Sequence, residues 1–154
     1  MNISTHTIDI DPTLIQNIYG LKDSVLSKKR SNRGGWQSPF YKLGSHDWAT
    51  PTIDQVMQAA NHSLAITYWF NVNGTNHFND WHDHGDFGER TSGCLYIQVP
   101  SDSGDIEFKH GKHIRSIQPT SGMLILFADN IKHRVLVNKS NDDRITMAFN
   151  CWKM

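Results

Sequence analysis

The chain has 154 residues, the length of one domain, and folding a chain of this size removes roughly 70% of its surface from water. Fifteen lysines and arginines balance fifteen aspartates and glutamates, which argues against a nucleic-acid or anionic-membrane partner bound by bulk charge. No apolar run approaches the ~20 residues of a membrane span, and no signal segment opens the chain. Cys94 and Cys151 are too few for a disulfide framework, so we expect a cytoplasmic protein.

Two or three helices are expected within residues 1–63, and two of them have clear signals. Asp11-Pro12 is a helix start, and apolar residues then recur at helical spacing from Leu14 to Leu26. Lys28-Lys29-Arg30 closes this helix by complementing the negative end of its dipole. Thr50-Pro51 repeats the start signal in front of a shorter apolar pattern. These helices are predicted to support one face of a sheet.

From residue 64 onward, short β-branched and aromatic runs alternate with turn residues, which is typical of strands. Such a series favours a sandwich or jelly roll over βαβ units. We therefore expect a single domain over 1–154, with a helical buttress at 1–63 and a jelly-roll core at 64–150. The expected strands are 64–72, a short one near 79–84, 94–99, 104–108, 113–117, 123–128, 134–138 and 144–150.

Nine histidines are present, and His82 and His84 are separated by one residue. Residues two apart on a strand point to the same face, so both imidazoles can bind one metal ion. His84 and Asp86 stand in the same relation if the strand continues. A third ligand must come from elsewhere, and His133 is well placed between two apolar strands. Imidazoles with open coordination positions suit iron(II) better than structural zinc, which fills all four positions.

Arg144 follows His133 by eleven residues and opens the last expected strand. An arginine at a strand start is ordinarily a surface ion-pairing residue. Its planar guanidinium can also bind one end of a small dicarboxylate whose other end binds the metal. Motifs for phosphate, dinucleotide or zinc binding and for serine hydrolysis are absent from the sequence.

The candidate residues lie within a series of motifs that extends over about residues 31 to 150. In order, these are Ser31-Asn32, Gly34-Gly35-Trp36-Gln37-Ser38, Trp69-Phe70-Asn71-Val72, Asn79 with His82-x-His84, Ser92-Gly93-Cys94-Leu95-Tyr96-Ile97-Gln98-Val99-Pro100, Ser103-Gly104-Asp105-Ile106-Glu107-Phe108, Pro119-x-x-Gly122-x-Leu124-x-Leu126-Phe127, His133-x-Val135 and Arg144-Ile145-x-x-x-Phe149-Asn150. The series resembles the 2-oxoglutarate/Fe(II)-dependent oxygenases of the His-x-His type, which occur in bacteria and marine phages. Each motif is weak alone, but their shared order makes the resemblance specific.

The resemblance implies a mainly β fold with N-terminal helices, namely a double-stranded β-helix, or cupin-like jelly roll, with the metal at one mouth. It implies that His82 and His133 bind Fe(II) and that Arg144 binds the C5 carboxylate of 2-oxoglutarate. The implied enzyme is a dioxygenase that uses O2 and 2-oxoglutarate, releases succinate and CO2, and hydroxylates an unidentified substrate.

The middle metal ligand has two alignments with the family pattern. Counting forward from Trp69 gives the set His82, His84 and His133, which we prefer because Asn79 also fits. Counting back from Ser92-Gly93 gives His84-x-Asp86 instead, which makes the carboxylate of Asp86 a ligand. His84 is a ligand in both alignments. An all-histidine set lacks the carboxylate's negative charge, which weakens the expected hold on Fe(II).

Secondary roles and alternative functions stay open. Tyr96 and Asn71 are candidates for hydrogen bonds to the cosubstrate, although buried structural roles are commoner for such residues. Trp36, Trp69 and Trp81 either line a substrate mouth or belong to the core.

The alternatives to a 2-oxoglutarate oxygenase are a cupin-like three-histidine dioxygenase and a non-catalytic jelly-roll binding module. The sequence names neither the substrate nor the oligomeric state.

Overall fold

The structure, a computed structural model, describes residues 1–61, 65–85 and 90–153. The elements in chain order are β1 (Ile3–Thr7), α1 (Thr13–Ser24), β2 (Asn32–Arg33), β3 (Trp36–Gln37), β4 (Tyr41–Lys42), a 3-10 turn (Asp47–Ala49), α2 (Thr50–Ala59), β5 (Ala65–Asn73), β6 (Phe78–His82), β7 (Thr91–Gln98), β8 (Ile106–His110), β9 (His113–Ile117), β10 (Met123–Ala128), β11 (Lys132–Val135) and β12 (Arg144–Trp152). Among the described residues, no helix is long and apolar enough to cross a membrane.

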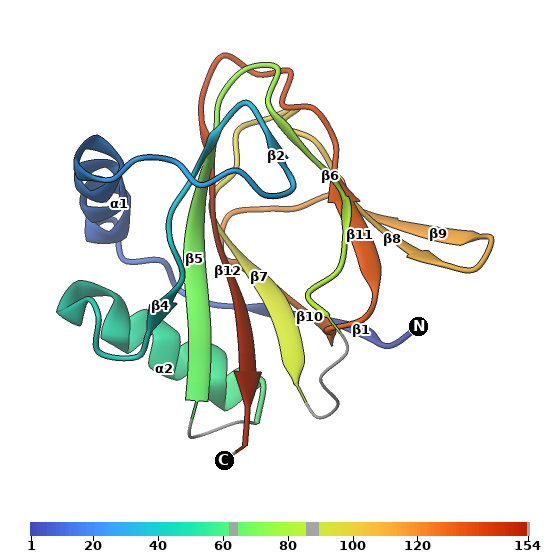
Figure 1. Cartoon of the computed structure of the whole chain (residues 1–154), viewed down its shortest axis with the longest axis horizontal. Helices are drawn as coiled ribbons and strands as arrows, with labels where there is room; N and C mark the ends of the chain where they lie inside the picture. Colours follow the sequence, from blue (N-terminus) through green and yellow to red (C-terminus); the bar gives the residue numbers. More distant parts are fainter. Residues whose placement is uncertain (62–64, 86–89, 154) are drawn as a thin grey trace.

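The strands form two antiparallel sheets that face each other (Figure 1). The larger sheet has the order β1-β10-β7-β12-β5-β3, with β4 also paired to β5. The smaller sheet has the order β2-β6-β11-β8-β9. Strands that are neighbours in the sheets are mostly distant in sequence, as in a jelly roll. The expectation of a mainly β, antiparallel fold is confirmed.

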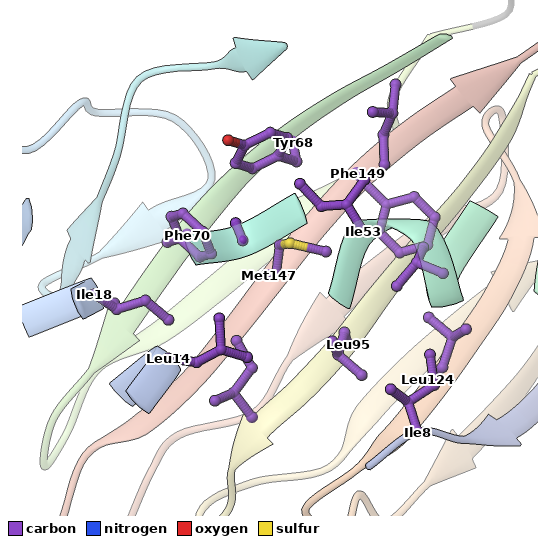
Figure 2. Close-up of a cluster of buried hydrophobic side chains, with 14 of the residues drawn as sticks. Ile8, Leu14, Ile18, Ile53, Tyr68, Phe70, Leu95, Leu124, Met147 and Phe149 are labelled. Atoms are coloured by element: carbon purple, nitrogen blue, oxygen red, sulfur yellow. The ribbon is translucent and has the colours of Figure 1, made fainter. Parts of the chain in front are cut away.

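The two helices cover the outer face of the larger sheet (Figure 1). Figure 2 shows Leu14 and Ile18 of α1 and Ile53 of α2 directed toward the sheet, where Phe70 and Met147 lie. All five side chains are at most 1% exposed. Burying a side chain of this size contributes roughly 1.5–3 kcal/mol. This apolar layer fixes the larger sheet in place behind the pocket described below.

Alternation along β12 gives the larger sheet two chemically different faces. Ile145, Met147 and Phe149 point outward into the helical core, whereas Arg144 and Thr146 line the space between the sheets. Such a period of two follows from the strand's pleat. The same strand therefore contributes to the core on one face and to a polar cavity on the other.

The glycine-rich segment after α1 crosses from one sheet to the other. Asn32 pairs with Asn79 in the smaller sheet, and Trp36 pairs with Val72 in the larger sheet. Between them, Gly34 and Gly35 have φ of +68° and +63°. A Cβ on Gly35 would lie 2.3 Å from the Oδ1 of Asn73. Glycine is required here by both the left-handed backbone and the close approach.

Most expected strands are confirmed to within a few residues, but the first 63 residues are not purely helical. They also contain β1 to β4, of which three are two-residue strands. Very short strands carry no periodic pattern of their own, because their partners in the sheets define them. Leu64, at the start of one expected strand, lies outside the described residues.

The first helix is shorter than expected. It starts as predicted, with the Thr13 N–H donating to Asp11 Oδ1 at 2.9 Å, but it ends at Ser24. Leu26, expected on its apolar face, is 90% exposed. The reason is tertiary, since the carbonyl of Val25 accepts a hydrogen bond from Trp36 Nε1 at 2.9 Å. The basic run at 28–30 therefore lies past the helix and does not close it.

Candidate metal centre and cosubstrate pocket

The inner faces of the two sheets enclose a pocket of about 510 Å³, its open mouth included. The lining combines polar side chains with apolar and aromatic ones. They are Ser31, Gln37, Trp69, Asn71, Asn73, Asn79, His82, His84, Gly93, Cys94, Tyr96, Ile106, Phe127, His133, Val135, Arg144, Thr146 and Ala148.

Three histidines converge at one level of this pocket. His82 of β6 lies directly opposite His133 of β11, and their ring centroids are 4.2 Å apart. His84 follows the end of β6, with ring centroids 5.0 Å from His133 and 5.7 Å from His82. One ligand atom from each ring lies within 4.8 Å of the others. The structure thus brings together the three histidines that the first alignment selects.

Two of these rings are oriented by backbone carbonyls. The Nδ1 of His82 lies 2.7 Å from the carbonyl oxygen of Asp80, and the Nδ1 of His133 lies 2.9 Å from that of Ile131. A carbonyl oxygen only accepts, so each Nδ1 carries the proton and donates it. In a neutral ring, Nε2 then presents its lone pair, as a metal ligand requires.

His84 is held by a side chain instead. Its Nδ1 lies 2.9 Å from Oδ1 of Asn150 on β12, and the Ser92 hydroxyl donates to the same oxygen at 2.5 Å. The backbone N–H of His84 donates to the carbonyl of Asp129 at 2.8 Å. The Asn150 oxygen therefore fixes the His84 ring with Nδ1 as donor and leaves Nε2 for a metal.

Burial keeps all three imidazoles neutral. It lowers the pKa of His84 to about 4, and it holds the pKa of His133 well below its usual range. The pKa of His82 is also lowered, again mainly by burial. Metal ions bind the neutral imidazole, so these rings need not lose a proton at pH 7 before binding.

Arg144 lies at the other level of the pocket and is only 2% exposed. Its Nη1 donates to the carbonyls of Ser103 and Leu136. Its Nη2 is buried and has no hydrogen-bond partner among the described residues. Burial also lowers the pKa of this guanidinium. A buried cation with a free donor is costly unless an anion binds it, and a carboxylate is the natural acceptor.

Two further side chains predicted to bind a cosubstrate line the same pocket as Arg144. The hydroxyl of Tyr96 is buried without a partner in the described part of the chain, and burial raises its pKa well above the usual value, so it remains a donor. Asn71 also lines the pocket, but its Oδ1 is the unpartnered atom. A carboxylate accepts hydrogen bonds only, so Asn71 can serve one only through its Nδ2.

The level of the pocket that holds the histidines and the level that holds Arg144 are separated along β12 and β5. Arg144 pairs with Asn73, whereas four residues later Ala148 pairs with Trp69, whose ring lies 5.1 Å from that of His84. Four residues of strand correspond to about 13 Å. The pocket therefore offers metal ligands at one end and an anion donor at the other. This donor set fits Fe(II) with 2-oxoglutarate, whose keto acid end can bind the metal while its C5 carboxylate reaches Arg144.

Asp86, the alternative ligand, lies outside the described residues. Of the three tryptophans considered from the sequence, one has each expected role and the third has neither. Trp36 is a core residue that is 6% exposed, Trp69 lines the pocket, and Trp81 is not part of its lining. Asn150 and Ser92 were not assigned roles from the sequence, although both belong to the quoted motifs. Ser92 meets Asn150 through the register of β12 against β7, and Asn150 in turn contacts His84. No local pattern reveals either contact.

Comparison with known proteins points to one class. Residues 109–150 match the model of the family described as "Putative 2OG-Fe(II) oxygenase". This segment contains His133, Arg144 and Asn150, so it includes residues from both ends of the pocket. The resemblance identified from the sequence is confirmed over this segment. Among curated protein sequences the chain has no match.

Solved structures share the fold at low identity. A prolyl-4-hydroxylase from Pseudomonas putida matches with a TM-score of 0.72 and 15% identity, over 99% of this chain and 92% of that one. The viral collagen prolyl hydroxylase from Paramecium Bursaria Chlorella virus-1, solved as a 2OG complex, gives 0.68 and 13%, over 97% and 96%. HygX from Streptomyces hygroscopicus, with nickel and 2-oxoglutarate bound, gives 0.70 and 10%, over 99% and 83%. The chain thus has the fold of these oxygenases.

Proposed function

We propose that this protein is a 2-oxoglutarate- and Fe(II)-dependent dioxygenase that hydroxylates a substrate. In the overall reaction, 2-oxoglutarate, O2 and a substrate C–H bond give succinate, CO2 and a substrate C–OH group. One oxygen atom of O2 enters succinate and the other enters the substrate. The observation that carries the proposal is the pairing, in one pocket, of three converging imidazoles with the unpartnered Nη2 of buried Arg144.

In this proposal, His82, His84 and His133 hold the metal through Nε2, and Asn150 positions the His84 ring. Arg144 binds the C5 carboxylate of 2-oxoglutarate, assisted by the Tyr96 hydroxyl. The bound iron supplies the redox chemistry of O2 activation. Asp86 remains the alternative ligand in place of His82.

The apolar lining has a separate role in the proposal. Phe127 packs against the imidazole of His133 with ring centroids 4.7 Å apart, and Ile106 and Val135 also line the pocket. These groups keep bulk water away from the metal ligands. Water exclusion protects a reactive oxidant from side reactions.

A three-histidine dioxygenase that does not use 2-oxoglutarate is the second candidate, and the all-imidazole ligand cluster favours it. Such an enzyme has no required use for a dicarboxylate-binding arginine. The free donor of Arg144 therefore favours the first candidate. A non-catalytic binding module would likewise need no such arginine beside a metal site.

Turnover of the cosubstrate alone tests the proposal. The aerobic protein is supplied with Fe(II) and 2-oxoglutarate, and succinate is measured by mass spectrometry. We expect slow, Fe(II)-dependent succinate formation that falls at least 100-fold in Arg144→Met. Exposed Arg115 on β9 provides the matched control, because Arg115→Gln should retain the wild-type rate. Equal rates in wild type and Arg144→Met would contradict the proposal.

The setting of the enzyme is also part of the proposal. We take residues 1–154 as one domain and place it in the cytoplasm, where reducing conditions favour Fe(II) and free thiols. Both Cys94 and Cys151 are free. Burial raises the pKa of each thiol to about 12, so neither is a ready nucleophile at neutral pH.

A further inference from the structure

A series of side chains in contact through their rings leads from the surface to the metal-binding histidines. The guanidinium carbon of Arg30 lies 4.8 Å from the ring centroid of Phe40. The Phe40 ring is 4.7 Å from that of Trp69, which in turn is 5.1 Å from the His84 ring. Trp69 lines the pocket, whereas the large apolar side chain of Phe40 is 49% exposed. We call Arg30, Phe40 and Trp69 the lip.

The charge of the lip is not neutralised by the described part of the protein. Within it, no carboxylate lies within ion-pair distance of Arg30, and the nearby Asp80 pairs with Arg33 at 2.9 Å. Lys28 and Lys29, both exposed, precede Arg30 and add positive charge. A guanidinium stacked on an aromatic face still has edge N–H donors that can bind a carboxylate.

A second pair of an arginine and an aromatic ring in this protein serves as a comparison, because its role is purely structural. Arg134 stacks on Trp81 with its guanidinium carbon 4.6 Å from the ring centroid. That cation is paired with Glu107 at 2.6 Å, and neither Arg134 nor Trp81 lines the pocket. Arg30 differs on both counts, since no described carboxylate pairs with it and its aromatic partner contacts a pocket-lining residue.

We propose that the lip recognises the primary substrate, and that this substrate is an organic acid bearing an aromatic or alicyclic ring. The ring lies against Phe40 and Trp69, and the anionic group binds Arg30. Trp69 then places the ring's inner edge next to His84, where the oxidation takes place. This inference rests on the proposed function, because it assigns the substrate class of the same site.

Ligand-observed NMR tests the lip with two probes that differ only in their charged group, 3-phenylpropanoate and 3-phenylpropanamide. The protein is supplied with Zn(II) and saturating 2-oxoglutarate, so that Arg144 is not available to the probe. Saturation-transfer signals give the affinity of each probe, and the 2-oxoglutarate signals in the same spectra report whether the cosubstrate is bound. Replacing Zn(II) by Mn(II) broadens the lines of a probe that lies near the metal.

We expect the acid to bind at least fivefold more tightly than the amide and to be broadened by Mn(II). Arg30→Gln should abolish the preference for the acid while leaving the amide unchanged. Phe40→Ser should weaken both probes about tenfold, and Arg115→Gln should change neither.

Equal binding of the acid and the amide, or a preference that survives in Arg30→Gln, would overturn the proposed lip. Failure of the proposed function looks different. In that case 2-oxoglutarate does not bind, with or without metal, whatever the two phenylpropanoid probes do. A charge preference that persists without 2-oxoglutarate binding would support the lip as an anion-binding surface and overturn the oxygenase assignment.

Discussion

His82 and His133 occupy directly opposed positions on β6 and β11, and their imidazole centroids are 4.2 Å apart. Immediately beyond this pair, the register between the two strands shifts by one residue, so that Val135 pairs with Asn79. Because of the shift, His82 and Asn79 both face the pocket although they are three positions apart in the chain. A local irregularity of the sheet therefore places both a metal-ligand candidate and a polar wall residue inside the same cavity.

Asn150 offers the sharpest test of how His84 is oriented. Asn150→Ala removes the oxygen that accepts from His84 Nδ1, so we expect Fe(II) affinity to fall about 10–100-fold. Asn150→Asp keeps an acceptor at the same place and should retain most of the affinity. Fe(II) or Ni(II) titration of the two variants measures the difference. Equal loss in both variants would show that Asn150 acts only by packing.

Gly104 is predicted to be required for the position of Arg144. It has φ of +100°, and a Cβ there would lie 2.2 Å from the Leu136 carbonyl oxygen and 3.0 Å from Arg144 Nη1. Gly104→Ala should lower the free energy of unfolding by about 1–3 kcal/mol and weaken 2-oxoglutarate binding.

Gly111 is the matched control, because it also has positive φ but no described atom lies within 4 Å of the place that its Cβ would take. Gly111→Ala should lower the free energy of unfolding only through the strain of a Cβ at positive φ, and it should leave 2-oxoglutarate binding unchanged. Chemical denaturation and calorimetric titration separate the two effects. Unaltered cosubstrate affinity in Gly104→Ala would contradict the expected link between Gly104 and Arg144.

Tyr96 should matter for binding but not for folding. Its hydroxyl is buried without a partner among the described residues, so Tyr96→Phe removes an unsatisfied group and should leave the free energy of unfolding of the ligand-free protein unchanged or higher. The same change removes one donor to the C5 carboxylate, and a hydrogen bond to a charged group is worth roughly 1.5–3 kcal/mol. We therefore expect a 2-oxoglutarate dissociation constant at least tenfold higher. Loss of stability with unchanged affinity would assign Tyr96 a structural role.

His46 makes the fold sensitive to acid at a place remote from the metal centre. Its Nδ1 lies 2.8 Å from the Tyr68 hydroxyl, and burial lowers its pKa from the usual 6.5. Below pH 6.5 the unfolded chain takes up a proton that the folded protein resists. The free energy of unfolding should therefore fall from pH 6.5 downward, until the pH passes the lowered pKa of the folded state.

His46→Gln should remove this part of the pH dependence, whereas exposed His113→Gln should not. Urea denaturation at pH 7.5 and pH 5 measures both. Because the three pocket histidines also resist protonation, only the difference between each variant and the wild type is informative. Identical slopes for His46→Gln and the wild type would contradict the assignment to His46.

The sequence was a good guide wherever a residue's neighbours in the chain determine its environment. The β-branched and aromatic run at 144–150 correctly predicted a strand, and the spacing of His82 and His84 correctly predicted that both rings face one cavity. His133 and Arg144 were candidates from their places beside the expected strands, and the family motifs then gave them their expected roles. The end of α1 at Ser24 was missed because a hydrogen bond from Trp36 to the carbonyl of Val25 decides it.

Contacts between residues distant in the chain could not be predicted from the sequence. The hydrogen bond between His84 and Asn150 spans 66 residues and joins the segment after β6 to β12. The contacts from Arg30 through Phe40 to Trp69 likewise join residues that are distant in the chain. Neither set of contacts is encoded in a local pattern. The residues around an asparagine or an arginine in the sequence are no different when its side chain makes such a contact and when it faces solvent.

The central claim is that one pocket holds Fe(II) at its histidines and 2-oxoglutarate at Arg144. Anaerobic titration of the Fe(II)-loaded protein with 2-oxoglutarate tests it most directly, because chelation of Fe(II) by the keto acid gives a weak visible charge-transfer band. We expect the band in the wild type, its absence in His84→Ala, and a requirement for far more 2-oxoglutarate in Arg144→Ala. No band in the wild type, together with equal 2-oxoglutarate binding in wild type and Arg144→Ala, would contradict the claim.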